Sequence, residues 1–320
     1  MTAPLVGLEE IRAAAARLEG VVVRTPLLPA PTLAEACGAA EVRLKCENLQ
    51  RAGAFKARGG NNYVLRLSDE QVGRGVITYS SGNHAQAVAL AARLRGVRAV
   101  VVMPTTAPAV KVAGARALGA EVIFEGTTSL ERKARAEALA EAEGLQMVPP
   151  FDHPDIIAGQ GTVGLEIAEE WPEVDTVLAP VGGGGLAAGV AAAVRALRPR
   201  ARILGVEPEG GASMKAALEA GHPVTLERTG SIADGLLPVR AGDLTFRHLQ
   251  ALADGVVTVA DDAIREATRF LLHHHHLVVE FSGAATTAAL RSRRVDVEGR
   301  RVAVVVSGGN LDPSFLTELA

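Results

Sequence analysis

GVITYSSGNHAQAVALAARLRGVRAVVVM, residues 75–103, places a β-branched run, a helical stretch and a second β-branched run in immediate succession. The runs at 75–80 and 98–103 show no alternation with polar residues, which is typical of parallel strands buried on both faces beneath helices. The intervening residues 84–95 are alanine-rich and amphipathic. The same alternation predicts further helices and strands over residues 107–118, 121–124, 176–181, 186–197, 202–206, 261–272 and 301–306. The sequence therefore predicts an α/β fold.

Pro149-Pro150 interrupts this alternation. Proline and the residue before it resist helix, and proline lacks the N–H that a central strand needs. We therefore expect the chain to pass between two domains at this point. The last predicted strand, 301–306, lies close to the end of the 320 residues, so we expect no appended regulatory module.

The composition argues against two classes of partner. The formal net charge is -3 and charged residues make up 22%, so no excess positive charge is present to hold nucleic acid or an anionic membrane. The apolar runs are too short to span a bilayer.

Only two cysteines occur, Cys37 and Cys46, and the first ten residues lack the features of a signal peptide. We expect reduced thiols and a cytoplasmic location.

Tyr79-Ser80-Ser81-Gly82-Asn83-His84 ends a predicted strand and begins a predicted helix. Open α/β sheets bind ligands at such edges, where backbone donors and the positive helix terminus favour anions. The hydroxyls, the amide and the N–H groups could hold a carboxylate. A plain helix N-cap with a turn glycine explains the same residues equally well.

The glycines Gly182, Gly183, Gly184 and Gly185, followed by Leu186, form a second junction of strand and helix. Four consecutive glycines are costly in chain entropy, which indicates a backbone that must approach a ligand closely, and phosphate is the usual one. A dinucleotide site is the competing hypothesis. Gly183, Gly185 and Ala188 fit its fingerprint, and Glu207 lies about where a ribose-binding carboxylate would be.

Lys56 is one of five lysines in a chain with 33 basic residues. Its neighbours, Phe55 and Ala57, suggest a partly desolvated amine, whose pKa would fall and which could act as a Schiff-base nucleophile. For a single lysine, an ordinary surface position is the more common outcome. A fourth cluster, Ser307-Gly308-Gly309-Asn310, follows the last strand and would by itself be a simple turn.

Taken together and in this order, the four clusters resemble the fold-type II pyridoxal-phosphate enzymes, and within them the threonine dehydratase and serine racemase family. The resemblance covers nearly the whole chain. It also includes Lys45-Cys46-Glu47-Asn48-Leu49-Gln50, Ile157-Ala158-Gly159-Gln160-Gly161-Thr162, Gly205-Val206-Glu207-Pro208, Lys215-Ala216-Ala217-Leu218 and Ile232-Ala233-Asp234-Gly235. A dinucleotide enzyme would leave Lys56 and the Asn83 cluster without a role.

The resemblance implies a two-domain architecture like that of tryptophan synthase β, each domain a mostly parallel twisted sheet flanked by helices. Residues 1–66 and 150–320 would form the large pyridoxal-phosphate-binding domain and residues 67–149 the small one. The active site would lie in the cleft between them. A homodimer or homotetramer is also implied.

The resemblance further implies a role for each cluster. Lys56 would carry pyridoxal 5'-phosphate as a Schiff base and later act as base at the substrate α-carbon. The phosphate would lie on Gly182, Gly183, Gly184, Gly185 and Leu186, Asn83 would meet the 3'-oxygen, Ser307 would face the pyridine nitrogen and Glu280 would lie near the ring. Ser80, Ser81, Gly82, Asn83 and His84 would hold the substrate carboxylate. L-threonine, and L-serine, would then lose water and ammonia to give 2-oxobutanoate or pyruvate.

Departures from the family pattern leave other activities open. Ser81 stands where the family's dehydratases often have alanine and where its racemases have a serine that acts as acid or base on the face opposite the lysine, so serine racemase and threo-3-hydroxyaspartate dehydratase remain alternatives. The racemases' cation site corresponds here to Glu207, Gly211 and Ser213, which lacks one carboxylate and indicates at most a weakly bound cation. Ala54 and Phe281 also differ from the usual residues. A non-catalytic ligand-binding or dinucleotide-binding protein is the remaining hypothesis.

Residues 273–276 are four consecutive histidines. On a helix only the first and last share a face, and no carboxylate or cysteine accompanies them at ligand spacing. We expect ordinary surface at a helix end before a strand rather than a metal site.

Overall fold

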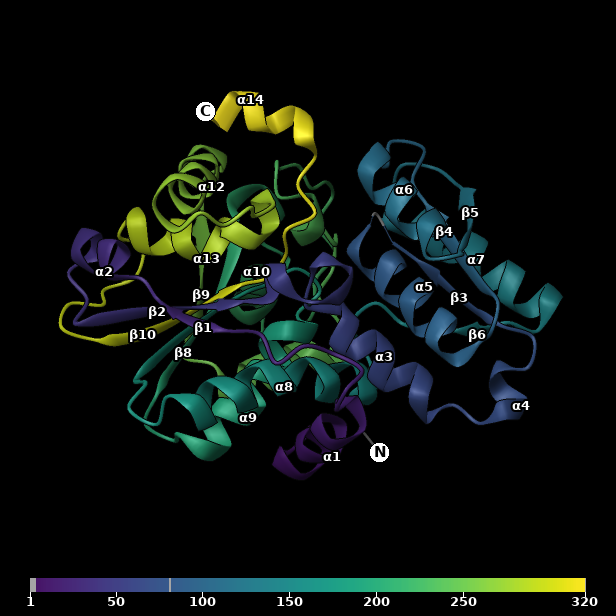
Figure 1. Ribbon diagram of the computed structural model, residues 1–320, viewed down its shortest axis with the longest axis horizontal. Helices are drawn as coiled ribbons and strands as arrows, with labels where there is room; N and C mark the ends of the chain where they lie inside the picture. The colour runs from purple at the N-terminus through teal and green to yellow at the C-terminus, as the bar shows by residue number, and fades with distance from the viewer. Residues whose placement is uncertain (1–3, 81, 320) are drawn as a thin grey trace.

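The computed structural model describes residues 4–80 and 82–319. Two separate sheets form its framework (Figure 1). The larger sheet has the order β1 (Leu27–Pro29), β2 (Glu41–Cys46), β10 (Arg301–Val306), β7 (Thr176–Pro180), β8 (Arg202–Pro208) and β9 (Gly255–Val259). The smaller has the order β5 (Glu121–Phe124), β4 (Ala99–Met103), β3 (Val76–Tyr79) and β6 (Gln146–Met147). Every pairing is parallel except that of β1 with β2, so the predicted α/β class is confirmed.

The helices cover both faces of the larger sheet and flank the smaller one (Figure 1). They are α1 (Leu8–Leu18), α2 (Pro31–Cys37), α3 (Lys56–Arg66), α4 (Asp69–Val72), α5 (Asn83–Arg95), α6 (Ala109–Ala117), α7 (Ser129–Glu143), α8 (Pro154–Glu170), α9 (Gly185–Leu197), α10 (Ser213–Ala220), α11 (Asp243–Leu252), α12 (Asp261–His275), α13 (Phe281–Arg291) and α14 (Leu316–Leu319). Short 3-10 turns are η1 (Glu47–Leu49), η2 (Arg51–Gly53), η3 (Glu209–Gly211), η4 (Asp234–Leu236) and η5 (Pro313–Phe315). None of the helices in the described part of the chain is long and apolar enough to cross a membrane.

The strands of the larger sheet are buried on both faces because their side chains alternate between two apolar layers. In β10, Val302, Val304 and Val306 pack with α12 and α13, whereas Ala303 and Val305 pack with α8, α9 and α11. Apolar side chains are therefore needed at every position of the strand, which explains why the sequence shows no polar alternation.

Helix α3 joins the two halves of the molecule (Figure 1). Two consecutive glycines allow this, one facing each half. A Cβ on Gly59 would lie 2.9 Å from the Ile156 carbonyl oxygen of α8, and one on Gly60 would lie 3.3 Å from the Ala87 Cβ of α5. Glycine is a poor helix former, so its presence here reflects close packing rather than helix propensity.

Two local predictions were wrong. We expected each of the four clusters at a strand's end before a helix, but the Lys56 cluster does not follow a strand directly, because β2 ends at Cys46 and the turns η1 and η2 occupy the intervening chain before α3. The histidine run ends α12 as expected, but residues 277–280 form no strand and lead into α13. His274 and His275 pack on Phe270 instead.

Candidate active site

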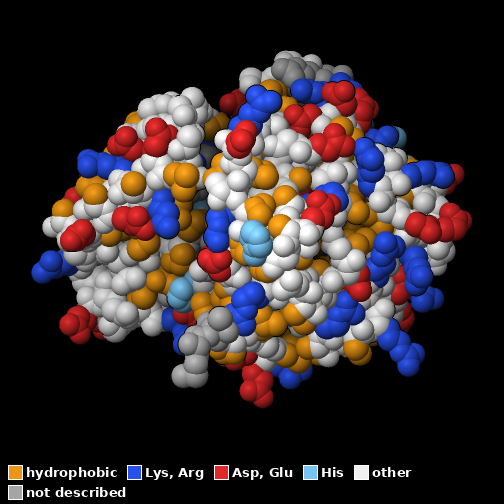
Figure 2. All heavy atoms as spheres, turned by 180° about the vertical axis from the view of Figure 1, so that it is seen from behind, with side chains coloured by type: hydrophobic (Ala, Val, Ile, Leu, Met, Phe, Trp, Pro, Cys, Tyr) orange, Lys and Arg blue, Asp and Glu red, His pale blue; other side chains and the backbone are white. Residues whose placement is uncertain are grey.

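The four clusters meet where the carboxyl ends of strands from both sheets face each other. The segment before α3 runs alongside the end of β10, because Ala54 pairs with Gly308 and the Phe55 N–H donates to the Ser307 carbonyl at 3.1 Å. Lys56 is therefore held next to buried Ser307. The 80–84 loop follows β3 and the glycine loop follows β7. A notch separates the two lobes on the surface seen in Figure 2.

Lys56 has the environment expected of a nucleophilic amine. Its Nζ donates to the Pro150 carbonyl at 2.6 Å and lies 5.2 Å from the centre of the Phe55 ring. Removal from water disfavours the charged ammonium and lowers the pKa of Lys56 to about 8. A large fraction of the amine is consequently neutral at mildly alkaline pH, as a nucleophile or base requires.

The glycine loop is shaped by three neighbouring side chains, Phe151, Thr245 and Met214. A Cβ on Gly183 would overlap the Phe151 ring, and Gly184 has φ +96, a conformation that favours glycine. A Cβ there would also lie 2.8 Å from Thr245 and Met214. Helix α9 begins at Gly185, so its first N–H groups have no partner within the helix and form an anion site.

Phe151 is itself held in place by the next residue. The Asp152 carboxylate accepts hydrogen bonds from the N–H groups of Asp243, Leu244 and Thr245 at 2.9–3.1 Å, at the start of α11. The Thr245 hydroxyl then donates to the Gly183 carbonyl at 2.6 Å. The segment that carries the Pro150 carbonyl, and with it the contact to Lys56, is thereby tied to the glycine loop.

The Asn83 amide has a defined orientation. Its Nδ2 donates to Glu280 Oε1, and its Oδ1 accepts from Asn310 Nδ2 at 3.0 Å. Asn310 is fixed in turn by a bond from the same nitrogen to the Ala52 carbonyl at 2.9 Å. Glu280 precedes α13 but does not cap it with its side chain, which is buried and points to Asn83.

The 80–84 loop presents polar groups beside Lys56. The Ser80 hydroxyl accepts from the Gly82 N–H at 3.1 Å. Buried His84 lies 3.3 Å through Nε2 from the Val148 carbonyl, so the ring carries its proton on Nε2. Burial, and then the Lys56 charge, lowers the pKa of His84 to about 3, which keeps the ring neutral. Its donor nitrogen is engaged, so only its backbone N–H is left for a carboxylate. Ser81 lies outside the described residues.

Sequence reasoning missed Lys111. This lysine of α6 is 4% exposed, and its Nζ lies 2.6 Å from Asp234 Oδ2 and 3.1 Å from Glu280 Oε2. The available signal was a lysine within the apolar stretch AVKVAGARA of a chain that has only five lysines. Lys111 comes from the smaller sheet's half, whereas both of its partners come from the larger one's.

Sequence reasoning also missed a buried charge network behind α3. Arg58 donates to Glu47 Oε2 at 2.8 Å and to Glu166 Oε1 at 2.6 Å, and Lys45 donates to Glu166 Oε2 at 2.5 Å. Burial alone would raise the pKa of Glu47, but the Arg58 guanidinium outweighs it and lowers that pKa. The network joins β2, α3 and α8 two residues after Lys56.

The predicted cation ligands lie apart from Lys56, at the end of β8. Glu207 is fully buried, and its two oxygens accept from the N–H groups of Met214 and Lys215 at 2.8 and 2.9 Å. Burial raises the pKa of Glu207 to about 7. The buried Ser213 hydroxyl has no hydrogen-bond partner among the described residues. Within those residues no group of three or more histidine, cysteine or acidic side chains forms a metal site, and this includes the histidine run.

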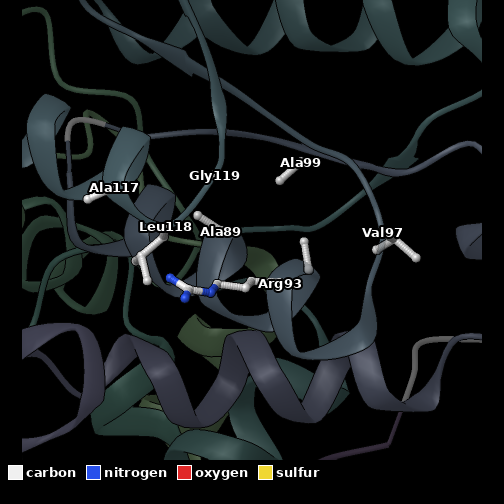
Figure 3. A pocket seen from close by; sticks show the side chains of 8 residues that line it. Ala89, Arg93, Val97, Ala99, Ala117, Leu118 and Gly119 are labelled. Atoms are coloured by element: carbon white, nitrogen blue, oxygen red, sulfur yellow. The ribbon is translucent and has the colours of Figure 1, made fainter.

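A surface pocket of about 420 Å³ lies away from these clusters (Figure 3). It opens between α5, β4 and the end of α6, and four of its eight lining residues are alanine; the others are Arg93, Val97, Leu118 and Gly119. That lining contains no lysine, serine or cysteine that could act as a nucleophile, so the pocket is not the reactive centre.

Comparison with known proteins agrees with this geometry. A family model described as "Pyridoxal-phosphate dependent enzyme" matches residues 18–308. The chain belongs to this family. The predicted cofactor is thus pyridoxal phosphate, and the dinucleotide hypothesis for the Gly183 loop is abandoned.

Relatives of this pyridoxal-phosphate enzyme carry several names, and three of them serve as examples. It is 42% identical over 315 residues to L-threonine ammonia-lyase of Thermotoga maritima, covering 98% of this chain and 78% of that protein. It is 42% identical over 299 residues to an L-threo-3-hydroxyaspartate ammonia-lyase of a Pseudomonas species, covering 93% of each. The structure of maize serine racemase matches with a TM-score of 0.94 at 40% identity, covering 98% of this chain and 97% of that one.

The residues at the site fit this cofactor. An amine of lowered pKa is available at Lys56 for a carbonyl group, and the glycine loop at the α9 N-terminus suits a phosphate. The residue directly after β10 is Ser307, which offers a neutral hydroxyl rather than a carboxylate.

Proposed function

We propose that this enzyme removes water and ammonia from L-threonine, and from L-serine, to give 2-oxobutanoate or pyruvate. The observation that carries the proposal is the partly buried Lys56 amine, whose pKa is lowered to about 8 at the meeting point of the strand-end loops. The likeness to L-threonine ammonia-lyase over 98% of the chain supports this substrate class.

In this proposal each cluster has one task toward the cofactor. Lys56 binds it covalently, and the N–H groups of Gly182, Gly183, Gly184, Gly185 and Leu186 hold its phosphate. Asn83 donates to its 3'-oxygen, Glu280 supports Asn83, and the neutral Ser307 hydroxyl faces the pyridine nitrogen. The backbone and hydroxyl groups of Ser80, Ser81, Gly82, Asn83 and His84 hold the substrate carboxylate.

The chemistry follows from the properties of Lys56. When bound, pyridoxal phosphate supplies an electron sink for the pair released at the substrate α-carbon. The Lys56 amine, once free, accepts the α-proton, and its lowered pKa makes the neutral form available for this step. The β-hydroxyl takes up one proton and leaves as water. The unsaturated product then tautomerises and takes up one water, releasing ammonia and the 2-oxo acid.

The test is the formation of 2-oxobutanoate from L-threonine by the purified holoenzyme, with K56A as the comparison. Borohydride reduction followed by peptide mapping identifies the lysine that carries the cofactor. We expect label on Lys56 and no turnover by K56A. Label on another lysine, or no 2-oxobutanoate from wild-type enzyme with bound cofactor, contradicts the proposal.

Ser81 favours a second activity, racemisation of serine or dehydration of threo-3-hydroxyaspartate, and relatives of both names are similar over most of the chain. Chiral analysis after incubation with L-serine, and an oxaloacetate assay with L-threo-3-hydroxyaspartate, test the two. We expect S81A to lose any D-serine formation while it keeps 2-oxobutanoate production. Persistence of pure L-serine with wild-type enzyme eliminates the racemase.

We also propose that the protein is cytoplasmic and forms a homodimer or homotetramer. In each chain, residues 67–149 would form the small domain. A cation would bind weakly at Glu207, Gly211 and Ser213. All four strands of the smaller sheet fall within residues 76–147, which supports the domain division. The unpartnered Ser213 hydroxyl supports the cation. Light scattering measures the assembly, and a melting temperature that does not respond to K⁺ or Mg²⁺ argues against the cation.

A further inference from the structure

Lys111 crosses from one half of the molecule to the other through the active site. Its stem passes directly over Gly82, where a Cβ would overlap Lys111 Cδ. Its ammonium reaches Asp234 and Glu280 at 2.6 and 3.1 Å. Gly82 therefore leaves the room that this lysine needs.

The two carboxylates depend on Lys111 to different degrees. The Asp234 side chain is 37% exposed and keeps water contact, whereas that of Glu280 is 4% exposed. Burial would lower the pKa of Lys111, but Glu280 and then Asp234 outweigh it and raise that pKa, so the lysine stays charged. A buried carboxylate has little water to stabilise its charge and needs a cation beside it. Glu280 is thus the partner that depends more on Lys111.

The contact with Glu280 determines which way the Asn83 amide points. A carboxylate accepts hydrogen bonds, so Glu280 Oε1 selects the Asn83 orientation with Nδ2 toward Glu280 and Oδ1 toward Asn310. Lys111 holds the other oxygen, Oε2, so its removal would free the Glu280 side chain to turn and would take Oε1 away from Asn83. With Nδ2 on Glu280, the second N–H of Asn83 remains for a ligand oxygen.

We propose that Lys111 is a positioning residue: by pairing with Glu280 from the opposite half of the molecule, it fixes the Asn83 amide with an N–H directed to the cofactor. The inference rests on the proposed function only in assigning Asn83 to the cofactor 3'-oxygen. It adds Lys111, on α6, as a residue that acts on Asn83 through Glu280. Because Lys111 and Glu280 come from different halves, the cofactor is held correctly only when the two halves are in contact.

The test compares K111M and K111R holoenzymes with K133M, a matched control in which an exposed lysine of the same half loses an ion pair with Glu137. Three quantities are measured: the visible absorbance maximum of the bound cofactor, the cofactor Kd, and kcat and KM with L-threonine. We expect K111M to displace the maximum, raise the Kd and lower kcat by about tenfold or more. K111R should retain most of both values, and K133M should match wild type.

E280Q provides a second route, because it leaves Lys111 paired with Asp234 and removes only the charge that orients Asn83. We expect E280Q to displace the maximum in the same direction, and K111M/E280Q to be no worse than the poorer single variant. A K111M or E280Q enzyme with wild-type absorbance and kcat but a lower melting temperature overturns the proposal, since the cluster would then only join the two halves. If K111M fails to fold, E280Q alone decides.

Failure of the proposed function looks different. In that case the wild-type enzyme itself forms no 2-oxobutanoate, while the effects of K111M and E280Q on absorbance and cofactor Kd are still measurable and still decide the role of Lys111.

Discussion

At the level of single residues, two lysines of the active site differ in pKa because their surroundings differ. Lys56 loses water contact without gaining an acidic partner, and its pKa falls. Lys111 is more deeply buried but meets two carboxylates, and its pKa rises. Two lysines of one active site are thus set for opposite tasks, one as a neutral amine and the other as a permanent cation.

The lowered pKa of Lys56 predicts a pH dependence of stability in the cofactor-free protein. Between about 8 and its ordinary pKa of 10.5, the unfolded chain binds more protons at this lysine than the folded chain does. The free energy of unfolding contributed by Lys56 therefore rises with pH across this window. Urea titrations at pH 7.5 to 10.5 should show wild type gaining stability relative to K56M. A constant difference between the two proteins would argue against a depressed pKa.

Gly183 predicts a second effect at this level. G183A would drive a methyl group into the Phe151 ring, so we expect a loss of about 1–3 kcal/mol in unfolding free energy and weaker cofactor binding. G230A is the control, because no atom lies within 4 Å of a Cβ at that glycine. In F151A/G183A the added room should offset part of the binding defect. Equal behaviour of G183A and G230A in a cofactor titration would refute this role.

At the level of elements, α3 is held by two kinds of contact: buried ion pairs at Arg58, and close packing at Gly59 and Gly60. Arg58 lies at the centre of the network that ties α3 to β2 and α8, and it is completely buried along with Glu47. Replacement of one member leaves the others as uncompensated buried charges, which costs more than the pair gains by forming.

We therefore expect R58M to lower the unfolding free energy by about 3–5 kcal/mol. R24M removes an exposed ion pair with Glu169, whose side chains are 55% and 47% exposed, and should cost about 1 kcal/mol or less. Urea denaturation of both variants measures the contrast. Similar values for the two would mean that the Arg58 network contributes no more than a surface pair.

These elements also indicate how far sequence can reach. Strands 121–124 and 301–306 were predicted with the bounds they have. For 301–306 the reason is that a strand buried on both faces is a nearly uninterrupted apolar run. The clusters around Lys56, Asn83, Gly182 and Ser307 were predicted because each is a local motif. Lys111 and the Arg58 network were not, since their meaning arises only when partners more than a hundred residues away come within hydrogen-bond distance.

At the level of the whole molecule, both cysteines are buried in the same hydrophobic core. Cys37 and Cys46 are free and buried in the layer between the larger sheet and α12 and α13. Burial raises the pKa of Cys37, and it raises that of Cys46 to about 12, so thiolate is scarce at neutral pH.

A thiol reagent should therefore report global opening. We expect Cys46, which is fully inaccessible, to react in native protein at least about a hundred times more slowly than in denaturant, where two thiols are counted. Rapid labelling of Cys46 at neutral pH in native protein would show that the core opens locally.

Gly59 and Gly60 have a mechanical consequence. Each glycine lets α3 pack closely against a different half, so α3 lies where the two halves meet and is held by both. If the halves rotate relative to each other about α3, the displacement of any group grows with its distance from this helix. Lys56, the first residue of α3, would then move less than Lys111, which lies on α6.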